Sequence, residues 1–152
     1  MCGPEDRKYH NFDDEHQKHF YIAASQFYRM LLTGRVKSKS NLIRTQTISS
    51  VEYVVHQKTL KTFNLKKKLF EDKRRGLNRD GKVKELLLFH GTDASNIDSI
   101  FENNFAIDAV PNPRMVYGRG VYMSEHPQIA LCYGDTLLLS RVSSLPHPPI
   151  YI

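Results

Sequence analysis

Cysteine is scarce in this sequence of 152 residues, where it occurs only as Cys2 and Cys132 and never as a CxxC pair. A disulfide framework or a zinc finger requires more cysteines at characteristic spacings, so we expect neither. Disulfides are rare in the cytosol and the nucleus, because thiols are kept reduced there. The cysteine content therefore predicts a nuclear or cytoplasmic protein.

Long apolar runs are also missing. Runs such as Leu86–Phe89 and Leu137–Leu139 are only a few residues long, whereas a membrane helix needs about 20 apolar residues. The first residues, Met1–Lys8, contain no apolar region of the kind that a secretory signal carries. Residues 1–11 are largely polar, which favours a frayed terminus. We expect no membrane span and no secretory signal.

The formal net charge is +6, and the excess lies in two basic runs, Lys66–Lys68 and Lys73–Arg75. Such a run most often marks a solvated helix face. Contact with nucleic acid and a nuclear localisation signal are the alternatives. No aromatic side chain, which would offer a base a stacking platform, lies within either run. The solvated face is therefore favoured over a nucleic-acid site.

The length suits one domain, and no internal repeat is visible. Apolar residues at helical spacing predict a helix over 12–33, and alternating residues predict a strand over 42–48. The Ser-Ser-Val-Glu sequence at 49–52 has the spacing of a capping box. It predicts a second helix that begins near Ser50, carries the basic runs and ends before a loop over 76–81.

Short apolar runs and turn residues divide the second half of the chain into short elements. In chain order these are a strand at 86–89 buried on both faces, a helix at 95–102 ended by a left-handed residue at Asn103–Asn104, a loop at 107–116, a strand at 120–123, a helix from Pro127 to about Tyr133–Gly134, and a strand at 136–142. Helices and strands mix without a regular βαβ alternation, which predicts the α+β class.

His90-Gly91-Thr92 follows the buried apolar run. A side chain at the end of such a strand is held rigidly, and a following glycine has no Cβ to keep a flat ligand from the backbone. The N–H and C=O of Gly91 then match the acceptor and donor of a carboxamide. The alternative is a histidine that is satisfied in the core or in a turn.

Tyr117-Gly118-Arg119-Gly120 leads to Tyr122, and Tyr133 follows eleven residues later. A dinucleotide fingerprint GxGxxG is excluded, because Met123 stands where its third glycine would be. Two tyrosines on a strand end and a short helix can form a slot for an aromatic ring, in which stacking contributes about 0.5–1.5 kcal/mol. The alternatives are an ordinary turn and two core tyrosines.

The order of these motifs resembles the NAD-binding half of a catalytic domain of the poly(ADP-ribose) polymerase type, one of the diphtheria-toxin-like ADP-ribosyltransferases. The likeness covers about 42–142. It implies an α+β fold with a mostly antiparallel sheet and flanking helices, here incomplete at its C-terminus. Residues 1–40 are expected to form an N-terminal helix and connector, and 41–152 a partial catalytic domain.

The resemblance also implies roles for single residues. The family's histidine bonds a ribose hydroxyl of NAD+, and its glycine backbone holds the nicotinamide carboxamide. One tyrosine packs beside nicotinamide and a second stacks on it. Carried over, the catalytic candidates are His90 and Tyr122, and the NAD+-binding candidates are His90, Gly91, Thr92, Tyr117, Tyr122 and Tyr133.

The implied activity is NAD+-dependent transfer of ADP-ribose to a protein acceptor, with release of nicotinamide and without a metal. Two departures predict weak or absent activity. Ala130 stands where the family often has a hydroxyl residue, and no glutamate follows Glu125 to serve as the third signature residue. The alternative is a non-catalytic module that binds NAD+, ADP-ribose or nucleic acid. His16 and His19 lie one turn apart but have no third ligand nearby, so a metal site is not expected.

Overall fold

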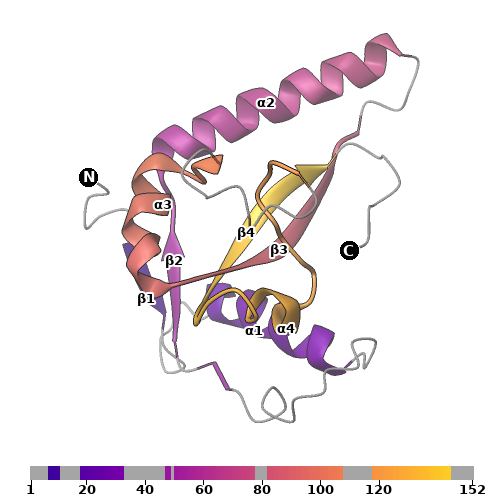
Figure 1. Ribbon diagram of the computed structural model, residues 1–152. Helices are drawn as coiled ribbons and strands as arrows, with labels where there is room; N and C mark the ends of the chain where they lie inside the picture. The colour runs from indigo at the N-terminus through magenta and orange to yellow at the C-terminus, as the bar shows by residue number, and fades with distance from the viewer. Residues whose placement is uncertain are drawn as a thin grey trace.

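The computed structural model describes residues 7–10, 18–32, 47–48, 50–77, 82–107 and 118–144. Helices and antiparallel strands mix in this part of the chain, so the predicted α+β class is confirmed for it (Figure 1). In chain order the elements are β1 (Arg7–His10), α1 (Lys18–Leu32), β2 (Val51–Val54), α2 (Gln57–Gly76), β3 (Lys84–Thr92), a 3₁₀ turn (Ala94–Asn96), α3 (Ile97–Asn103), α4 (Pro127–Ala130) and β4 (Thr136–Ser144).

A long antiparallel pair, β3 and β4, lies at the centre of the molecule. Its register runs from Lys84 opposite Ser144 to Thr92 opposite Thr136. The predicted strands at 86–89 and 136–142 are confirmed, and both are longer than expected. The prediction that the first strand is buried on both faces was wrong, because only Phe89 of its apolar run is fully buried. In the described residues this sheet has only two strands, and Leu86, Leu87 and Leu88 are partly buried.

The core gathers at the C-terminal half of β3. Phe27 of α1, Phe89 of β3 and Ala130 of α4 are buried together, and three partly buried apolar side chains pack against them: Ile48, Leu137 and Leu139. The rings of Phe27 and Phe89 meet edge to face, with centroids 6.4 Å apart. Full burial of one such side chain stabilises the fold by about 1.5–3 kcal/mol. This core fixes α1 and α4 against β3 just before His90.

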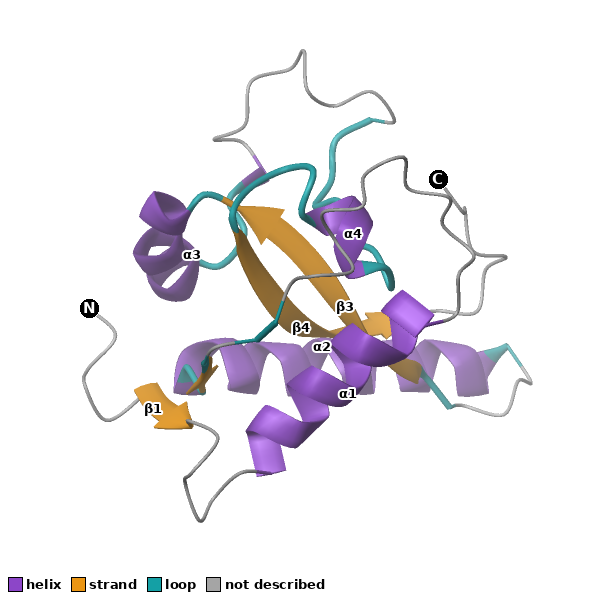
Figure 2. Cartoon of the chain, turned by 90° about the horizontal axis from the view of Figure 1, so that it is seen from below, coloured by secondary structure: helices purple, strands orange, loops and turns teal. Residues whose placement is uncertain are grey.

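Figures 1 and 2 show α1 and α4 on one side of the β3–β4 pair and α2 on the other. The helix predicted at 12–33 is confirmed over 18–32, and the rest of that range is outside the described residues. None of the helices described here has the length and apolarity that crossing a membrane requires.

The segment after Ser50 is a strand, so the predicted start of the second helix was wrong. Val51–Val54 forms β2 and pairs antiparallel with β1, which also corrects the expectation of a frayed terminus for Arg7–His10. β-branched and aromatic residues favour this conformation, and the ladder with β1 satisfies the backbone that a helix would otherwise use. The helix begins at Gln57, after His56, whose ring Nδ1 lies 2.9 Å from Thr59 Oγ1.

Two further predictions fail around the chain's shorter elements. Residues 120–123 form no strand, because the segment makes a single bridge to β3, at Ser124. The helix after His126 covers only Pro127–Ala130 and does not reach Tyr133. Of the strand predicted at 42–48, residues 47 and 48 lie in no strand, and the others are outside the described part.

The remaining predictions lie around α2 and α3. α2 extends through Gly76, so the predicted loop begins later, and residues 78–81 are outside the described part. The helix predicted at 95–102 is confirmed as α3, with a 3₁₀ turn before it. Asn104 has the expected positive φ of 61°, with an extended ψ. Residues 108–116 of the predicted loop, and all residues after Ser144, are not described.

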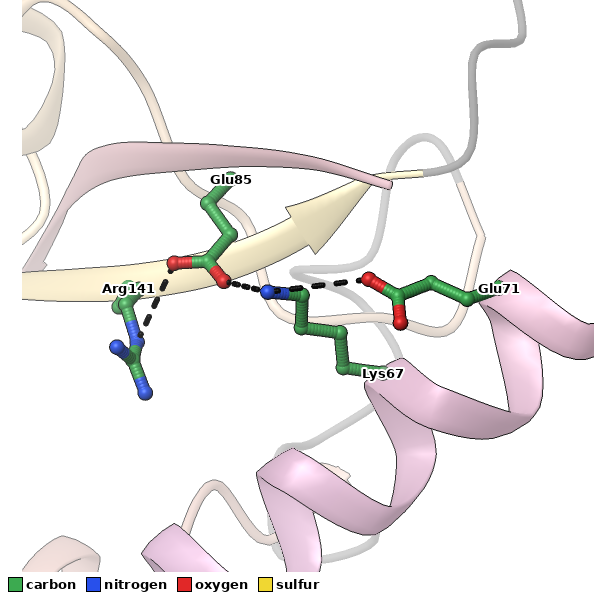
Figure 3. Close-up of polar contacts among 4 residues, drawn as sticks. All are labelled: Lys67, Glu71, Glu85 and Arg141. Carbon is green, nitrogen blue, oxygen red and sulfur yellow. Dashed lines mark hydrogen bonds and ion pairs between the residues drawn. The ribbon is translucent and has the colours of Figure 1, made fainter. Parts of the chain in front are cut away.

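Charged side chains join α2 to the far end of the β3–β4 pair (Figure 3). Lys67 Nζ donates to Glu85 Oε1 at 2.5 Å, Arg141 Nε lies 3.7 Å from Glu85 Oε2, and the Arg141 guanidinium lies over the Phe63 ring. The hydrogen bond from Lys67 lowers the pKa of Glu85, and the same bond raises the pKa of Lys67. We call Lys67, Glu85 and Arg141 the charged clamp.

The clamp corrects part of the prediction for the two basic runs. Lys67 faces β3, and Arg74 is only 8% exposed, so these two side chains do not belong to a solvated face. The other four basic residues of the runs are exposed, as predicted: Lys66, Lys68, Lys73 and Arg75.

Candidate functional site

The predicted motifs lie side by side at the C-terminal end of β3. Phe89 N–H donates to the Ser124 carbonyl at 2.7 Å, and Ser124 N–H donates back at 2.9 Å. This two-bond bridge brings the segment 118–124 alongside His90 and Gly91. The segment runs antiparallel to β3 on the side opposite to β4.

His90 contacts this neighbouring segment directly. Its ring Nδ1 lies 2.9 Å from the backbone carbonyl oxygen of Tyr122, and the side chain is half-buried. The ring of Phe105 meets the His90 ring edge to face, with centroids 4.9 Å apart. The family resemblance implies that the loop from Phe105 to Val116 borders the NAD+ pocket, but nothing in the sequence pairs Phe105 with His90. The turn after α3 brings the two rings together.

The backbone of Gly91 points its polar groups away from β4. Phe89 directs both its N–H and its C=O to Ser124, and alternate residues of a strand share the same direction. If the antiparallel pairing of Phe89 with Ser124 continued along both segments, Gly91 would pair with Tyr122. The Tyr122 carbonyl instead contacts the His90 ring. No hydrogen bond joins Gly91 to another described residue outside the β3–β4 ladder. Gly91 thus keeps a donor and an acceptor adjacent to each other.

The missing Cβ of Gly91 serves packing within the protein. A Cβ there would lie 1.7 Å from the carbonyl oxygen of Ala130, far inside any real contact distance. At Gly134 a Cβ would lie 2.1 Å from the carbonyl carbon of Thr92. We expected a flat ligand to approach Gly91 closely, but on the side where a Cβ would lie, the backbone of α4 takes that place. Both glycines are needed for α4 and the turn after it to lie against β3.

Tyr122 links its own turn to His90. Its phenol donates to the Gly118 carbonyl at 2.7 Å, and its backbone carbonyl meets His90. Gly118 has a φ of +99°, a conformation that favours glycine. The phenol therefore closes the turn that positions the carbonyl. Tyr117, another NAD+-binding candidate, is outside the described residues.

Tyr133 follows α4 and has a largely free ring. Its side chain is 68% exposed, and its N–H donates to the Ala130 carbonyl at 3.0 Å. No ring contact joins Tyr133 to another described aromatic side chain. The slot expected between Tyr122 and Tyr133 stays a prediction. The backbone next to Tyr133 lies against Thr92, where Gly134 leaves no room for a Cβ.

Thr92 is engaged within the turn that follows β3. It is 7% exposed, and its hydroxyl accepts a hydrogen bond from the Asn96 amide at 3.1 Å. Nearby, Asp135 Oδ1 accepts from the Ala94 N–H at 3.2 Å and from the Thr136 hydroxyl at 3.0 Å. These bonds close the end of the β3–β4 pair. The sequence analysis did not identify Asp135, although a carboxylate directly before a strand is a common turn signal.

Within the described ranges, no three histidine, cysteine, aspartate or glutamate side chains are grouped to hold a metal ion. The His19 ring stacks on Tyr53 with centroids 3.6 Å apart. His16, the other half of the histidine pair, is outside those ranges.

A comparison with family models places the chain in a family. A family model described as the poly(ADP-ribose) polymerase (PARP) catalytic domain matches residues 27–143, well over half of the chain. The chain belongs to the PARP catalytic domain family. The PARP match starts within α1, ends within β4 and includes every candidate site residue. The suspected resemblance is thereby confirmed. A search of curated proteins found no match.

Proposed function

We propose that this chain binds NAD+ at the C-terminal end of β3 and is an NAD+-dependent protein ADP-ribosyltransferase. Membership of the PARP family supports the reaction class. The observation that carries the proposal is the paired donor and acceptor on Gly91, next to a His90 ring held by Tyr122.

In the proposed complex, the nicotinamide carboxamide pairs with the Gly91 N–H and C=O. A carboxamide has one acceptor oxygen and an N–H₂ donor, so it satisfies both groups. The Tyr122 ring packs beside nicotinamide and the exposed Tyr133 ring stacks on it. His90 bonds a ribose hydroxyl, as the family resemblance implies, and Thr92 and Tyr117 border the ligand.

The proposed reaction breaks the bond between the nicotinamide nitrogen and the ribose anomeric carbon. Nicotinamide leaves with the bonding electrons, and a nucleophile of the acceptor protein attacks that carbon and loses its proton. The transition state is oxocarbenium-like, as in glycoside hydrolysis. Clamping nicotinamide and exposing the anomeric carbon are the contributions of these residues. None of the proposed roles involves a metal ion.

We expect transfer to be slow, because Ala130 stands where the family often has a hydroxyl residue that bonds the nicotinamide carboxamide, and that bond is lost here. The same departure favours the second candidate function, NAD+ or ADP-ribose binding without transfer.

The test measures binding and transfer separately. NAD+ labelled in its adenylate half is incubated with the wild-type chain, with His90→Ala and with His56→Ala as a matched control directly before α2. Calorimetric titration with NAD+ accompanies each reaction. We expect His90-dependent binding and little labelling of protein. Strong His90-dependent labelling establishes the transferase and makes our expectation of slow transfer wrong. The absence of NAD+ binding by the wild-type chain would refute the proposed function.

A further inference from the structure

The His90 ring is held on a second side by a residue outside the family motif. Phe105 follows α3, is half-buried, and meets the His90 ring at an interplanar angle of 72°. Edge-to-face packing of this kind is a preferred arrangement of aromatic rings. The Phe105 N–H donates to Asn104 Oδ1 at 2.9 Å, and Asn104 has a φ of 61°. The turn after α3 therefore directs Phe105 to His90.

The contact with Tyr122 decides which nitrogen of His90 carries the proton. A backbone carbonyl only accepts hydrogen bonds, so Nδ1 donates across the 2.9 Å separation. In the neutral imidazole, Nε2 then has a lone pair and accepts. A ring that turned about its χ angles would lose the bond to Tyr122 and would no longer favour one tautomer.

We propose that Phe105 is a positioning residue for His90. Together with the Tyr122 carbonyl, its ring fixes the plane and the tautomer of His90, so that Nε2 offers an acceptor to a ligand group that donates, such as a sugar hydroxyl. Only the identity of the ligand rests on the proposed function. The ring contact and the tautomer belong to the protein without ligand, and they can be measured there.

The first experiment observes the ligand-free chain. Long-range ¹H–¹⁵N correlation spectra report the tautomer of each histidine, and the His90 signals are assigned by their loss in His90→Gln. We expect the Nδ1–H tautomer in the wild type and a mixture of tautomers in Phe105→Leu. Phe105→Tyr keeps the ring and should restore the wild-type spectrum. Phe70→Leu removes a half-buried ring from α2 and should leave His90 unchanged.

The second experiment titrates the same variants with NAD+. Loss of the aromatic contact should weaken binding by about 2- to 10-fold in Phe105→Leu, while Phe105→Tyr and Phe70→Leu bind as the wild type does. If the wild type does not bind NAD+, the proposed function fails, whereas the tautomer measurement still decides the role of Phe105.

Two outcomes of the tautomer measurement would overturn the proposal: an Nε2–H tautomer in the wild type, or an unchanged His90 tautomer in Phe105→Leu. If Phe105→Leu does not fold, Phe105→Met replaces it, since methionine fills similar space without a ring. The wild-type tautomer and the cross-relaxation between the two rings need no variant at all. A wild type without that cross-relaxation contradicts the packing on which the proposal depends.

Discussion

The two ends of β3 use polar groups in opposite ways. At the N-terminal end, Glu85 is paired with Lys67 and Arg141, and these charges hold α2 to the sheet. At the C-terminal end, the Gly91 N–H and C=O form no hydrogen bond to another described residue outside the β3–β4 ladder, and Tyr133 is exposed. Polar groups that already have partners stabilise the fold, whereas the Gly91 N–H and C=O, which lie on a buried residue, keep the capacity to bond a group that reaches them. The difference locates the candidate site at one end of a single strand.

Gly91→Ala should have the largest effect on stability and would test whether the C-terminal end depends on close backbone packing. A Cβ there would meet the Ala130 carbonyl, which belongs to the backbone and cannot turn aside. We expect a loss of about 1–3 kcal/mol or more in the free energy of unfolding, measured by urea denaturation and circular dichroism. Gly120→Ala is the control, since nothing lies within 4 Å of its Cβ position. Equal stability of the two variants contradicts the packing described for α4.

Tyr133→Ala should change binding but not folding. The ring is exposed, so its loss costs the fold little, whereas base–aromatic stacking contributes about 1–3 kcal/mol in related complexes. Titration with a nicotinamide analogue should show weaker binding by a free energy in that range. Tyr21→Ala, on the exposed side of α1, is the matched control. Unchanged affinity would mean that Tyr133 takes no part in the site.

Tyr122→Phe distinguishes the contribution of the Tyr122 hydroxyl from that of its aromatic ring. The variant loses the hydrogen bond to the Gly118 carbonyl but keeps the aromatic surface and the backbone carbonyl that meets His90. We expect a decrease of about 0.5–1.5 kcal/mol in the free energy of unfolding, with the His90 tautomer retained. Tyr28→Phe removes a phenol that accepts from the Ile48 N–H, and it serves as a comparison on α1. A changed tautomer would show that the turn itself depends on the phenol.

Glu85→Gln should have the smallest effect, since the clamp is partly exposed and screened by water and salt. The pKa of Glu85 is lowered in the folded chain, so its stabilisation is present above the ordinary value of 4.5 and is lost as the pH falls through the folded pKa. The pKa of Lys67 is raised, so its share is present below 10.5 and is lost as the pH rises through the folded value.

Thermal unfolding of the wild type and of Glu85→Gln checks this. The wild type should melt at a slightly higher temperature near neutral pH, and the difference should vanish in acid. Glu125→Gln, which removes an exposed carboxylate outside the charged clamp, is the matched control. A difference that persists in acid would exclude the charge of Glu85 as its cause.

Local patterns predicted some elements well and failed at others for identifiable reasons. The short continuous apolar runs predicted β3 and β4, since a run of this kind is typical of a strand that packs against a core. The capping-box pattern before Glu52 misled, because a pairing with β1, more than forty residues away in the sequence, outweighs a local helix signal. Lys67 and Glu85 are eighteen residues apart, so nothing within the basic run could indicate that one of its lysines turns inward.

The sequence by itself determined which residues are candidates, because the order of a histidine, glycines and tyrosines is a property of the chain, and the sequence of residues 27–143 matches the family model. Only the tertiary structure decided how these residues are used. The bridge between Phe89 and Ser124 aligns two distant segments. This alignment sets the proton position on His90, and it leaves the edge of Gly91 that faces away from β4 without a backbone pairing to Tyr122. Hydrogen bonds depend on direction and distance in space, and both are fixed only when segments far apart in the chain are packed together.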